Sequence, residues 1–185
     1  DPLGNFSSGS AIGGIQLRLG DKAPAQQTSQ IGLTGNLDAG AAIGDTHAMN
    51  ISVYDSAGAP HNLQVLFTNT APGAWSWSAS SPTAPVTPAG TGTVTFNANG
   101  SLATFTYPGG GTDITLTPAA GSPFTVTINP GAVNNFDGLA GFANPSNAVV
   151  NSQNGYASGD LINVAVDARG VITGSFTNGV SRSLA

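Results

Sequence analysis

The chain contains no cysteine and no glutamate, and it has few charged residues of either sign. Without cysteine it can have no disulfide, no thiolate metal site and no cysteine nucleophile. All nine acidic residues are aspartate, 7% of the 185 residues are charged, and the net charge is −5, whereas about 25% of the residues of an average domain are charged. The four basic residues are scattered, which excludes the basic patch that binds nucleic acids or anionic membranes.

Long apolar runs are also missing. None approaches the roughly 18 residues of a membrane-spanning helix, and no signal peptide is recognisable. The sequence starts at Asp1 and stops at Ala185 in mid-pattern. We therefore expect a fragment of a longer protein, in which the lack of a targeting signal says little about location.

Glycine, with 26 residues, and proline, with 12, are abundant. Such a composition is common in disordered chains. Here, however, the apolar residues fall into short alternating runs separated by turn residues, which is typical of an all-β domain. A chain of this length suits one domain or two small ones and can bury about two-thirds of its unfolded surface. The sequence therefore predicts an all-β protein with a hydrophobic core.

The clearest strand–turn–strand pattern lies in the stretch 154–184. Ile162, Val164 and Val166 alternate with other residues, which predicts a strand with one buried face. Asp167 can accept hydrogen bonds from turn amides, and Gly170 can take the positive φ that closes a hairpin. We therefore expect a β-hairpin at this end of the chain.

The return strand of this hairpin places Ile172, Gly174 and Phe176 on one face. Gly174 leaves room there for a close neighbour, with another backbone segment as one candidate. Two further motifs frame the hairpin: Asn154, Gly155, Tyr156 and Gly159 before it, and Asn178 and Gly179 after it.

The same turn chemistry recurs twice earlier in the chain. Alternating apolar residues over 49–53 and 63–67 predict a hairpin that turns at 55–58, again Asp-x-x-Gly. A related Asn-x-x-Gly turn at 97–100 follows a predicted strand at 94–96. The flanking sequences differ too much for an internal repeat, so the recurrence reflects shared turn chemistry.

The remaining apolar residues predict four more strands, at 15–19, 105–107, 114–116 and 124–128. Residues 20–30, which include Pro24, have the composition of a linker. Residues 79–92 contain three prolines, which cannot donate to a sheet ladder, and are predicted to be a loop. Residues 136–142 are predicted to form one helical turn or a tight loop.

These motifs closely resemble those of the bacterial flagellar hook protein family. That family has an Asn-Gly-Tyr run, a short strand, an Asp/Asn-x-x-Gly turn and a strand ending in an aromatic residue and Ser/Thr-Asn-Gly, in the order found here. It also has a Val-Tyr-Asp-Ser-x-Gly-x-x-His run, which fits residues 53–61. The rod proteins related to this family share parts of the pattern. The matching residues are Tyr54, Asp55, Gly58, His61, Gly100, Asn154, Gly155, Tyr156, Gly159, Asp167, Gly170, Gly174, Asn178 and Gly179.

The resemblance implies a fold of two domains. Residues 28–145 would form an outer β-barrel or sandwich domain. Residues 1–20 and 150–185 would together form a second, discontinuous inner β domain. We expect residues 12–19 to pack with 156–184, because neither segment has another convincing partner.

The resemblance also implies a function. A hook protein is a structural subunit that polymerises into the short curved tube that acts as a universal joint between motor and filament. The expected partners are copies of the same protein and other flagellar axial proteins, outside the cell after flagellar export. No enzymatic activity, cofactor, metal, nucleic acid or membrane is expected. The terminal helical regions that drive polymerisation in the family are not in this sequence, so we expect the fragment to be monomeric.

Few residues offer an alternative to this interpretation. His47 and His61 are expected at opposite ends of the 49–67 hairpin, with Tyr54 near His61 and His47 near Thr68, which does not favour a shared metal site. The aspartates are spread out, so no carboxylate pair for catalysis is predicted.

Two tryptophans are the basis of an alternative hypothesis, a sugar-binding module. Trp75 and Trp77 share one strand face. They could be an exposed platform for sugar stacking, which would suggest a carbohydrate-binding or adhesin module, but packing or a subunit interface is favoured. A distal-rod subunit is an alternative within the flagellar superfamily.

Overall fold

The structure is a computed structural model of the chain, and it describes residues 20 and 22–184. These residues form fifteen strands and one short 3₁₀ turn, Pro108–Gly110, which confirms the all-β prediction. No helix among them is long and apolar enough to cross a membrane. Their contacts divide them into two compact units. One unit combines the described residues before Pro24 with those from Gly159 onward, and the other is Pro24–Ser158.

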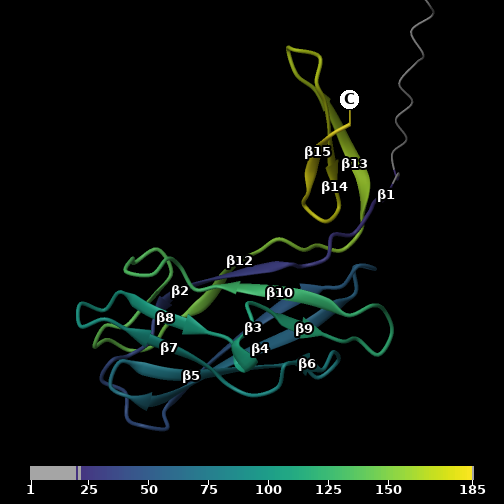
Figure 1. The fold of residues 1–185 in the computed structure, drawn as a ribbon. Helices are drawn as coiled ribbons and strands as arrows, with labels where there is room; N and C mark the ends of the chain where they lie inside the picture. Colours follow the sequence, from purple (N-terminus) through teal and green to yellow (C-terminus); the bar gives the residue numbers. More distant parts are fainter. Residues whose placement is uncertain (1–19, 21, 185) are drawn as a thin grey trace, which may run out of the picture. The chain divides into compact units, whose positions relative to one another are not determined.

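One sheet of the Pro24–Ser158 unit is assembled around β2 (Figure 1). Strands β10 and β11 pair with β2 in parallel, and β12 pairs with it antiparallel. Strands β9 and β6 extend the sheet beyond β10. The bounds are β2 (Gln30–Asn36), β6 (Val86–Thr87), β9 (Ile114–Leu116), β10 (Phe124–Asn129), β11 (Leu139–Ala140) and β12 (Val149–Gln153).

The other sheet of this unit is an antiparallel meander in the order β3-β4-β5-β7-β8. Tight turns connect β3 to β4, β4 to β5 and β7 to β8, whereas the segment between β5 and β7 contributes β6 to the other sheet. The bounds are β3 (Thr46–Tyr54), β4 (Pro60–Ala71), β5 (Ala74–Ser80), β7 (Gly92–Phe96) and β8 (Leu102–Thr106).

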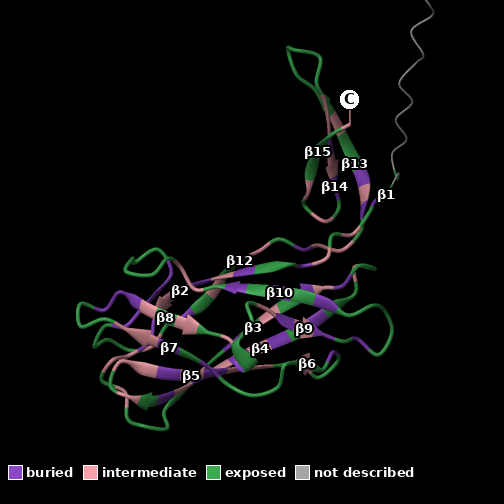
Figure 2. Cartoon of the chain, viewed as in Figure 1, coloured by how far each residue is buried: buried purple, intermediate pink, exposed green. Residues whose placement is uncertain are grey.

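A single hydrophobic core joins the two sheets. Its largest fully buried side chains include Phe67, Trp75 and Trp77 from the meander and Ile31 and Leu116 from the β2 sheet. Buried residues alternate with exposed or half-buried ones along β4 and with exposed ones along β10 (Figure 2), as expected for strands with one face on the core. The unit is therefore a β-sandwich, the second of the two architectures expected for the outer domain.

The register of the β3–β4 hairpin differs by one residue from the expected one. Tyr54 lies opposite Pro60, His61 opposite Val53, and His47 opposite Phe67. The shift arises in the turn, where Asp55 N–H bonds to Ala59 O. Because side chains alternate between the faces of a strand, His61 shares the core-facing side of β4 with Leu63, Val65 and Phe67.

The other unit contains a four-stranded sheet in the order β1-β13-β14-β15. Among its described residues, Ala23, Leu161 and Phe176 are buried, and Val164 and Leu184 pack against them. The bounds are β1 (Lys22–Ala23), β13 (Gly159–Val166), β14 (Ile172–Phe176) and β15 (Ser181–Ser183).

The prediction that Ile162, Val164 and Val166 share a buried face is wrong. Ile162 is 57% exposed and Val166 is 64% exposed, whereas Leu161 is buried. The pairing of β13 with β14 shifts register between Leu161 and Asn163. Such a bulge adds a residue to one strand and reverses which side chains face the core.

Several loop predictions also need correction. Residues 20–30 are not a free linker, because β1 pairs with β13 and Gln26 forms a bridge with Tyr156. The stretch 79–92 contains the two-residue strand β6, and 136–142 contains β11. Residues 150–158, expected in the inner domain, fall in the Pro24–Ser158 unit, where β12 pairs with β2. The predicted strand at 15–19 and its packing lie outside the described residues.

Candidate functional site

The turn between β3 and β4 is organised by the side chain of Asp55. Its Oδ1 accepts hydrogen bonds from the backbone N–H groups of Ala57 and Ala59, each at 2.9 Å. Gly58 has a φ of 83° and donates its N–H to Asp55 O at 3.0 Å. Aspartate therefore satisfies the turn amides, and glycine supplies the backbone conformation that other residues adopt only at a cost.

The turn between β13 and β14 repeats this geometry. Asp167 Oδ1 accepts hydrogen bonds from Arg169 N–H at 2.8 Å and Val171 N–H at 2.9 Å. Gly170 has a φ of 84° and donates to Asp167 O at 3.0 Å. Two Asp-x-x-Gly motifs in different units thus fold into the same local structure, as the sequence predicts.

The turn that ends at Gly100 also has a glycine with positive φ, but a different residue accepts the hydrogen bonds of the turn. Gly100 has a φ of 85°, yet the side-chain oxygen that accepts from the turn belongs to Asn99. Its Oδ1 accepts from Ser101 N–H at 3.0 Å and from Ser101 Oγ–H at 2.7 Å. A further turn at Gly179, with a φ of 80°, is capped by Asn178 Oδ1, which accepts from Val180 N–H at 3.1 Å.

The glycines differ in the space around them. A Cβ on Gly58 would lie 2.7 Å from Ala25 Cβ, and one on Gly100 would lie 2.7 Å from Phe142 Cε1. A Cβ on Gly170 would meet nothing within 4 Å. Gly58 and Gly100 are therefore needed for both conformation and close packing, whereas Gly170 is needed for conformation alone.

His61 extends the Asp55 turn into the core of the sandwich. Its Nε2 lies 3.3 Å from Asp55 Oδ2 and its Nδ1 lies 3.0 Å from Thr83 Oγ1. Its ring also packs beside Phe124, with ring centroids 6.1 Å apart. Both Asp55 and His61 are buried, so this row of three side chains ties the turn to the loop after β5. Sequence reasoning missed the pair, although His61 has the same spacing as Leu63, Val65 and Phe67 on the core-facing side of β4, which was the signal for its burial.

The electrostatics of Asp55 follow from these contacts. Burial by itself pushes its pKa up, because a carboxylate loses solvation. Together, the hydrogen bonds from Ala59, His61 and Ala57 outweigh the effect of burial. The pKa of Asp55 is therefore lowered from its ordinary value of 3.8. Asp55 is therefore charged in the folded protein, and both of its oxygens have partners.

The Asn154-Gly155-Tyr156 motif forms a clasp between the two ends of the Pro24–Ser158 unit. Asn154 Oδ1 accepts from Ser29 N–H at 2.9 Å and Gln30 N–H at 3.0 Å. Gln26 and Tyr156 exchange two backbone hydrogen bonds, each 2.9 Å long. The segment that enters this unit and the segment that leaves it therefore lie side by side.

Thr28 lies at the centre of the clasp and is fully buried. Its hydroxyl donates to Gln153 Oε1 at 2.9 Å and accepts from Tyr54 N–H at 2.9 Å. A Cβ on Gly155 would collide with Thr28 Oγ1, which explains why glycine is needed there. No sequence signal marked Thr28, because its partners lie 26 and 125 residues away in the chain.

Glycines also allow close packing in the smaller unit. A Cβ on Gly174 would lie 2.7 Å from Leu161 Cδ1 and 2.8 Å from Leu184 Cδ1. A Cβ on Gly159 would lie 2.6 Å from Asn178 Cγ. The predicted close neighbour of Gly174 is therefore a pair of leucine side chains.

Both tryptophans of β5 are buried, Trp75 at 2% and Trp77 at 0% exposure. The indole of Trp77 stacks on Phe105 at a centroid distance of 5.0 Å and donates its Nε1–H to Thr106 O at 2.9 Å. A sugar-stacking platform requires exposed rings. Both tryptophans thus lie in the core of the sandwich, and this observation argues against a carbohydrate-binding module.

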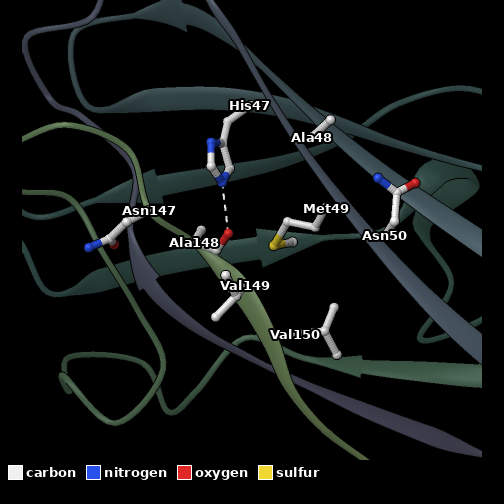
Figure 3. A pocket seen from close by; sticks show the side chains of 8 residues that line it. All are labelled: His47, Ala48, Met49, Asn50, Asn147, Ala148, Val149 and Val150. Carbon is white, nitrogen blue, oxygen red and sulfur yellow. Dashed lines mark hydrogen bonds between the residues drawn. The ribbon is translucent and has the colours of Figure 1, made fainter.

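His47 lies in a groove of about 530 Å³ between β3 and the segment that leads into β12. Figure 3 shows its imidazole reaching across the groove toward Ala148, where Nε2 lies 2.7 Å from the carbonyl oxygen. The walls are residues 47–50 and 147–150, none of which carries a formal charge apart from the titratable His47. The geometry fits a backbone or apolar contact better than a charged small molecule.

These residues do not assemble a reactive centre. His47 and His61 occupy opposite parts of β3–β4, and the described residues contain no group of three His, Cys, Asp or Glu side chains arranged to hold a metal. The Asp55–His61–Thr83 row resembles a proton-transfer arrangement in composition, but both imidazole nitrogens are occupied and the acid and the imidazole are buried. Its chemistry is that of a structural hydrogen-bond network.

Comparisons with known proteins agree with the family that the motifs suggest. A family model described as the flagellar basal body protein FlaE D2 domain matches residues 21–156. The flagellar hook protein FlgE of Helicobacter pylori is 31% identical over 151 residues, which cover 76% of this chain and 20% of the relative. FlgE of Salmonella typhimurium is 30% identical over 131 residues, which cover 69% of this chain and 30% of the relative.

Among solved structures, the crystal structure of Helicobacter pylori flagellar hook protein FlgE2 is similar, with a TM-score of 0.50 and 18% sequence identity. The match covers 75% of this chain and 31% of that chain, and it shows likeness of fold. The aligned part of the chain thus spans between a fifth and a third of the length of these relatives. Because the family model matches nearly all of the Pro24–Ser158 unit together with its turns and clasp, the chain belongs to the flagellar hook protein family and carries its FlaE D2 domain.

Proposed function

We propose that this chain is the central part of a structural subunit of the bacterial flagellar hook, the curved tube that joins the motor to the filament. The observation that carries the proposal is the match of residues 21–156 to the FlaE D2 domain, supported by hook proteins from Helicobacter and Salmonella. On this proposal the protein works outside the cell, in the flagellum, and its partners are copies of itself and other axial proteins.

The proposed role of the Pro24–Ser158 unit is that of an outer domain that moves as one body. Its clasp closes the unit where the chain enters and leaves, through Gln26 and Tyr156, and one core joins both sheets. Such a unit keeps its internal contacts while its neighbours in a tube change position. The low content of charged residues favours this, because like-charged copies packed side by side would repel one another.

The proposed inner domain is built from both ends of the chain, as the family resemblance suggests. The pairing of β1 with β13, Lys22 opposite Asp160 and Ala23 opposite Gly159, supports a discontinuous domain. We place the boundaries of the inserted unit at Pro24 and Ser158, which moves the C-terminal boundary beyond the expected residue 145.

A mechanical role requires no catalytic group, and we propose that the protein is not an enzyme. The chain itself is expected to stay monomeric at micromolar concentration, because the family's terminal helical regions that drive polymerisation lie outside this sequence. Sedimentation velocity checks this expectation. Growth into fibres at micromolar concentration would contradict it.

The location is tested by antibodies raised against this 185-residue chain and applied to intact flagella of the source bacterium. Immunogold labelling is expected along the short curved segment between the cell body and the filament. Deleting the gene should remove that segment, and restoring the full-length gene should bring it back. Labelling confined to the straight rod would support the distal-rod alternative, and labelling away from flagella would contradict both.

A further inference from the structure

Three asparagines of the chain, Asn99, Asn154 and Asn178, are each followed by glycine. Asparagine is a thermolabile residue, because its side-chain amide can react with the backbone nitrogen of the next residue. A following glycine makes this approach easiest, since it has no Cβ to hinder it. The three positions share one reactive sequence, so the structure around each decides how readily it reacts.

The clasp restrains Asn154 and the glycine after it. Asn154 Oδ1 accepts from Ser29 N–H and Gln30 N–H, and its Nδ2 donates to Ser29 Oγ at 2.8 Å. Gly155 is buried, and its N–H donates to Gln153 Oε1 at 3.1 Å. A reaction between the Asn154 amide and the Gly155 nitrogen therefore requires the clasp to open.

Asn99 and Asn178 occupy the same position in turns of the same kind. The glycine after each has a positive φ, 85° at Gly100 and 80° at Gly179. The N–H of that glycine donates to the backbone oxygen two residues before the asparagine, at 2.8 Å in the first turn and 3.0 Å in the second. In both turns the asparagine Oδ1 accepts from the N–H two residues further on. The two sites are a matched pair that differs in its surroundings.

The turn at Asn99 is packed against a distant segment of the sandwich unit. Gly100 is buried, and a Cβ there would lie 2.7 Å from Phe142 Cε1. Gly100 O also accepts from Gly141 N–H at 2.9 Å. Both contacts have to be broken before the Gly100 nitrogen can turn toward the Asn99 amide.

The turn at Asn178 has less packed against its glycine. Gly179 is exposed, and a Cβ there would meet nothing within 4 Å. The strand that leaves the turn, β15, has three residues, all exposed, and pairs with β14 alone among the described strands. Thr177, before the asparagine, exchanges two hydrogen bonds with Asp160, so opening involves the β15 side of the turn. Such short, exposed elements open at low free-energy cost.

We propose that Asn178 is a site of spontaneous deamidation and the first of the three asparagines to react in the folded chain. The backbone nitrogen of Gly179 gives its proton to solvent and attacks Cγ of Asn178. The new N–Cγ bond forms, the Cγ–Nδ2 bond breaks, and Nδ2 takes a proton from solvent and leaves as ammonia. Water then opens the cyclic imide at one or the other carbonyl, which gives aspartate or isoaspartate.

The products change the end of the smaller unit. Both carry a negative charge that the amide lacks, on a side chain packed beside Gly159, whose Cβ position lies 2.6 Å from Asn178 Cγ. The next residue is Asp160, so like charges are brought closer together. In isoaspartate the main chain runs through Cβ and Cγ, and the side-chain acceptor of Val180 N–H is lost. The reaction therefore loosens the β14–β15 turn, and this inference does not rest on the proposed hook function.

The test incubates the 185-residue chain at mildly alkaline pH and follows the three sites by peptide mass spectrometry, with isoaspartate measured by enzymatic methylation. We expect Asn178 to react about tenfold or more faster than Asn99 and Asn154, because its turn opens more readily. The same chain unfolded in guanidinium chloride is the control. Without the fold, the three rates should agree within about threefold.

A variant tests the reason for the difference. Phe142→Ala removes the ring over Gly100 and should raise the rate at Asn99 about threefold or more, while the rate at the distant Asn178 stays within about twofold. Equal rates at Asn99 and Asn178 in the folded wild-type chain, faster reaction at Asn154, or an Asn178 that stays intact would each overturn the proposal. None of these results bears on whether antibodies label the hook.

Discussion

At the residue scale, the same backbone conformation has different consequences at different glycines. Gly58 and Gly44 both have a positive φ, 83° and 94°, in the Pro24–Ser158 unit. A Cβ on Gly58 would lie 2.7 Å from Ala25 Cβ, whereas one on Gly44 would meet nothing within 4 Å. The two positions therefore separate the cost of strain from the cost of a collision.

This difference makes a prediction for two alanine variants. Gly44→Ala should destabilise the unit by about 1 kcal/mol, the cost of a left-handed conformation for a residue with a side chain. Gly58→Ala should cost about 2–4 kcal/mol, because steric overlap is added to that strain. Urea unfolding followed by tryptophan fluorescence measures both, since both tryptophans belong to this unit. Equal losses would mean that the contact with Ala25 yields freely.

The pH dependence of stability gives a second prediction, centred on Asp55. Its pKa is lowered by folding from 3.8, so ionised Asp55 stabilises the folded protein at pH values above 3.8, and this contribution is lost as pH falls through the lower folded pKa. Asp55→Asn, which stays neutral, should be less stable at neutral pH and should lose this part of the acid dependence.

Urea unfolding at several pH values between neutrality and strong acid compares the two proteins. The free-energy difference between wild type and Asp55→Asn should shrink as the solution is acidified through the region below pH 3.8. A constant difference across this range would show that the carboxylate charge has no role in stability. Parallel measurements of β-sheet content would confirm that both proteins start from the same fold.

At the scale of elements, the clasp makes the third prediction. Asn154→Ala removes the acceptor of the exposed Ser29 and Gln30 amides and should cost about 0.5–1.5 kcal/mol, the net contribution of a typical intramolecular hydrogen bond. Asn151→Ala is the matched control, because Asn151 is exposed and its side-chain oxygen accepts a hydrogen bond from the hydroxyl of the neighbouring Ser152 at 3.3 Å. It should change stability by no more than about 0.5 kcal/mol.

Hydrogen exchange distinguishes a local effect of Asn154→Ala from a global one. We expect faster exchange at Gln26, Gln30 and Tyr156, with little change in β4. If exchange in β4 rises equally, the clasp is part of the cooperative core. If exchange rises nowhere, water replaces the lost acceptor.

The sequence predicted elements well where the signal is local and poorly where a distant strand decides. The Asp167–Gly170 turn was predictable because all of its hydrogen bonds lie within five residues. The exposure of Ile162 was not predictable, because the bulge that exposes it depends on how β13 pairs with β14. No local pattern indicated that Thr28 would be buried and hydrogen-bonded in the clasp, since its partners belong to distant segments.

At the scale of the whole molecule, the fourth prediction concerns the independence of the two units. The Pro24–Ser158 unit contains a core cluster drawn from both of its sheets, whereas the described residues of the other unit include three that are buried at its centre. We expect a chain limited to residues 24–158 to fold alone, with the thermal midpoint of its tryptophan signal within a few degrees of that of the full chain. A molten or unfolded product would mean that the units form one cooperative structure.

The architecture of the chain was only partly predictable. Alternation of apolar residues predicted an all-β chain, but the division at Pro24 and Ser158 depends on the pairing of β12 with β2, which brings residues 149–153 back to 31–34. Neither segment has a pattern that identifies its partner.

The clasp has a consequence for how force passes through the protein. The chain enters and leaves the Pro24–Ser158 unit through adjacent segments that share the Gln26–Tyr156 hydrogen bonds. Tension applied along the chain on both sides is carried between these neighbours and bypasses the sandwich beyond them. The sandwich then carries little of the applied tension. Its size and surface can therefore change without altering the mechanical continuity of the chain.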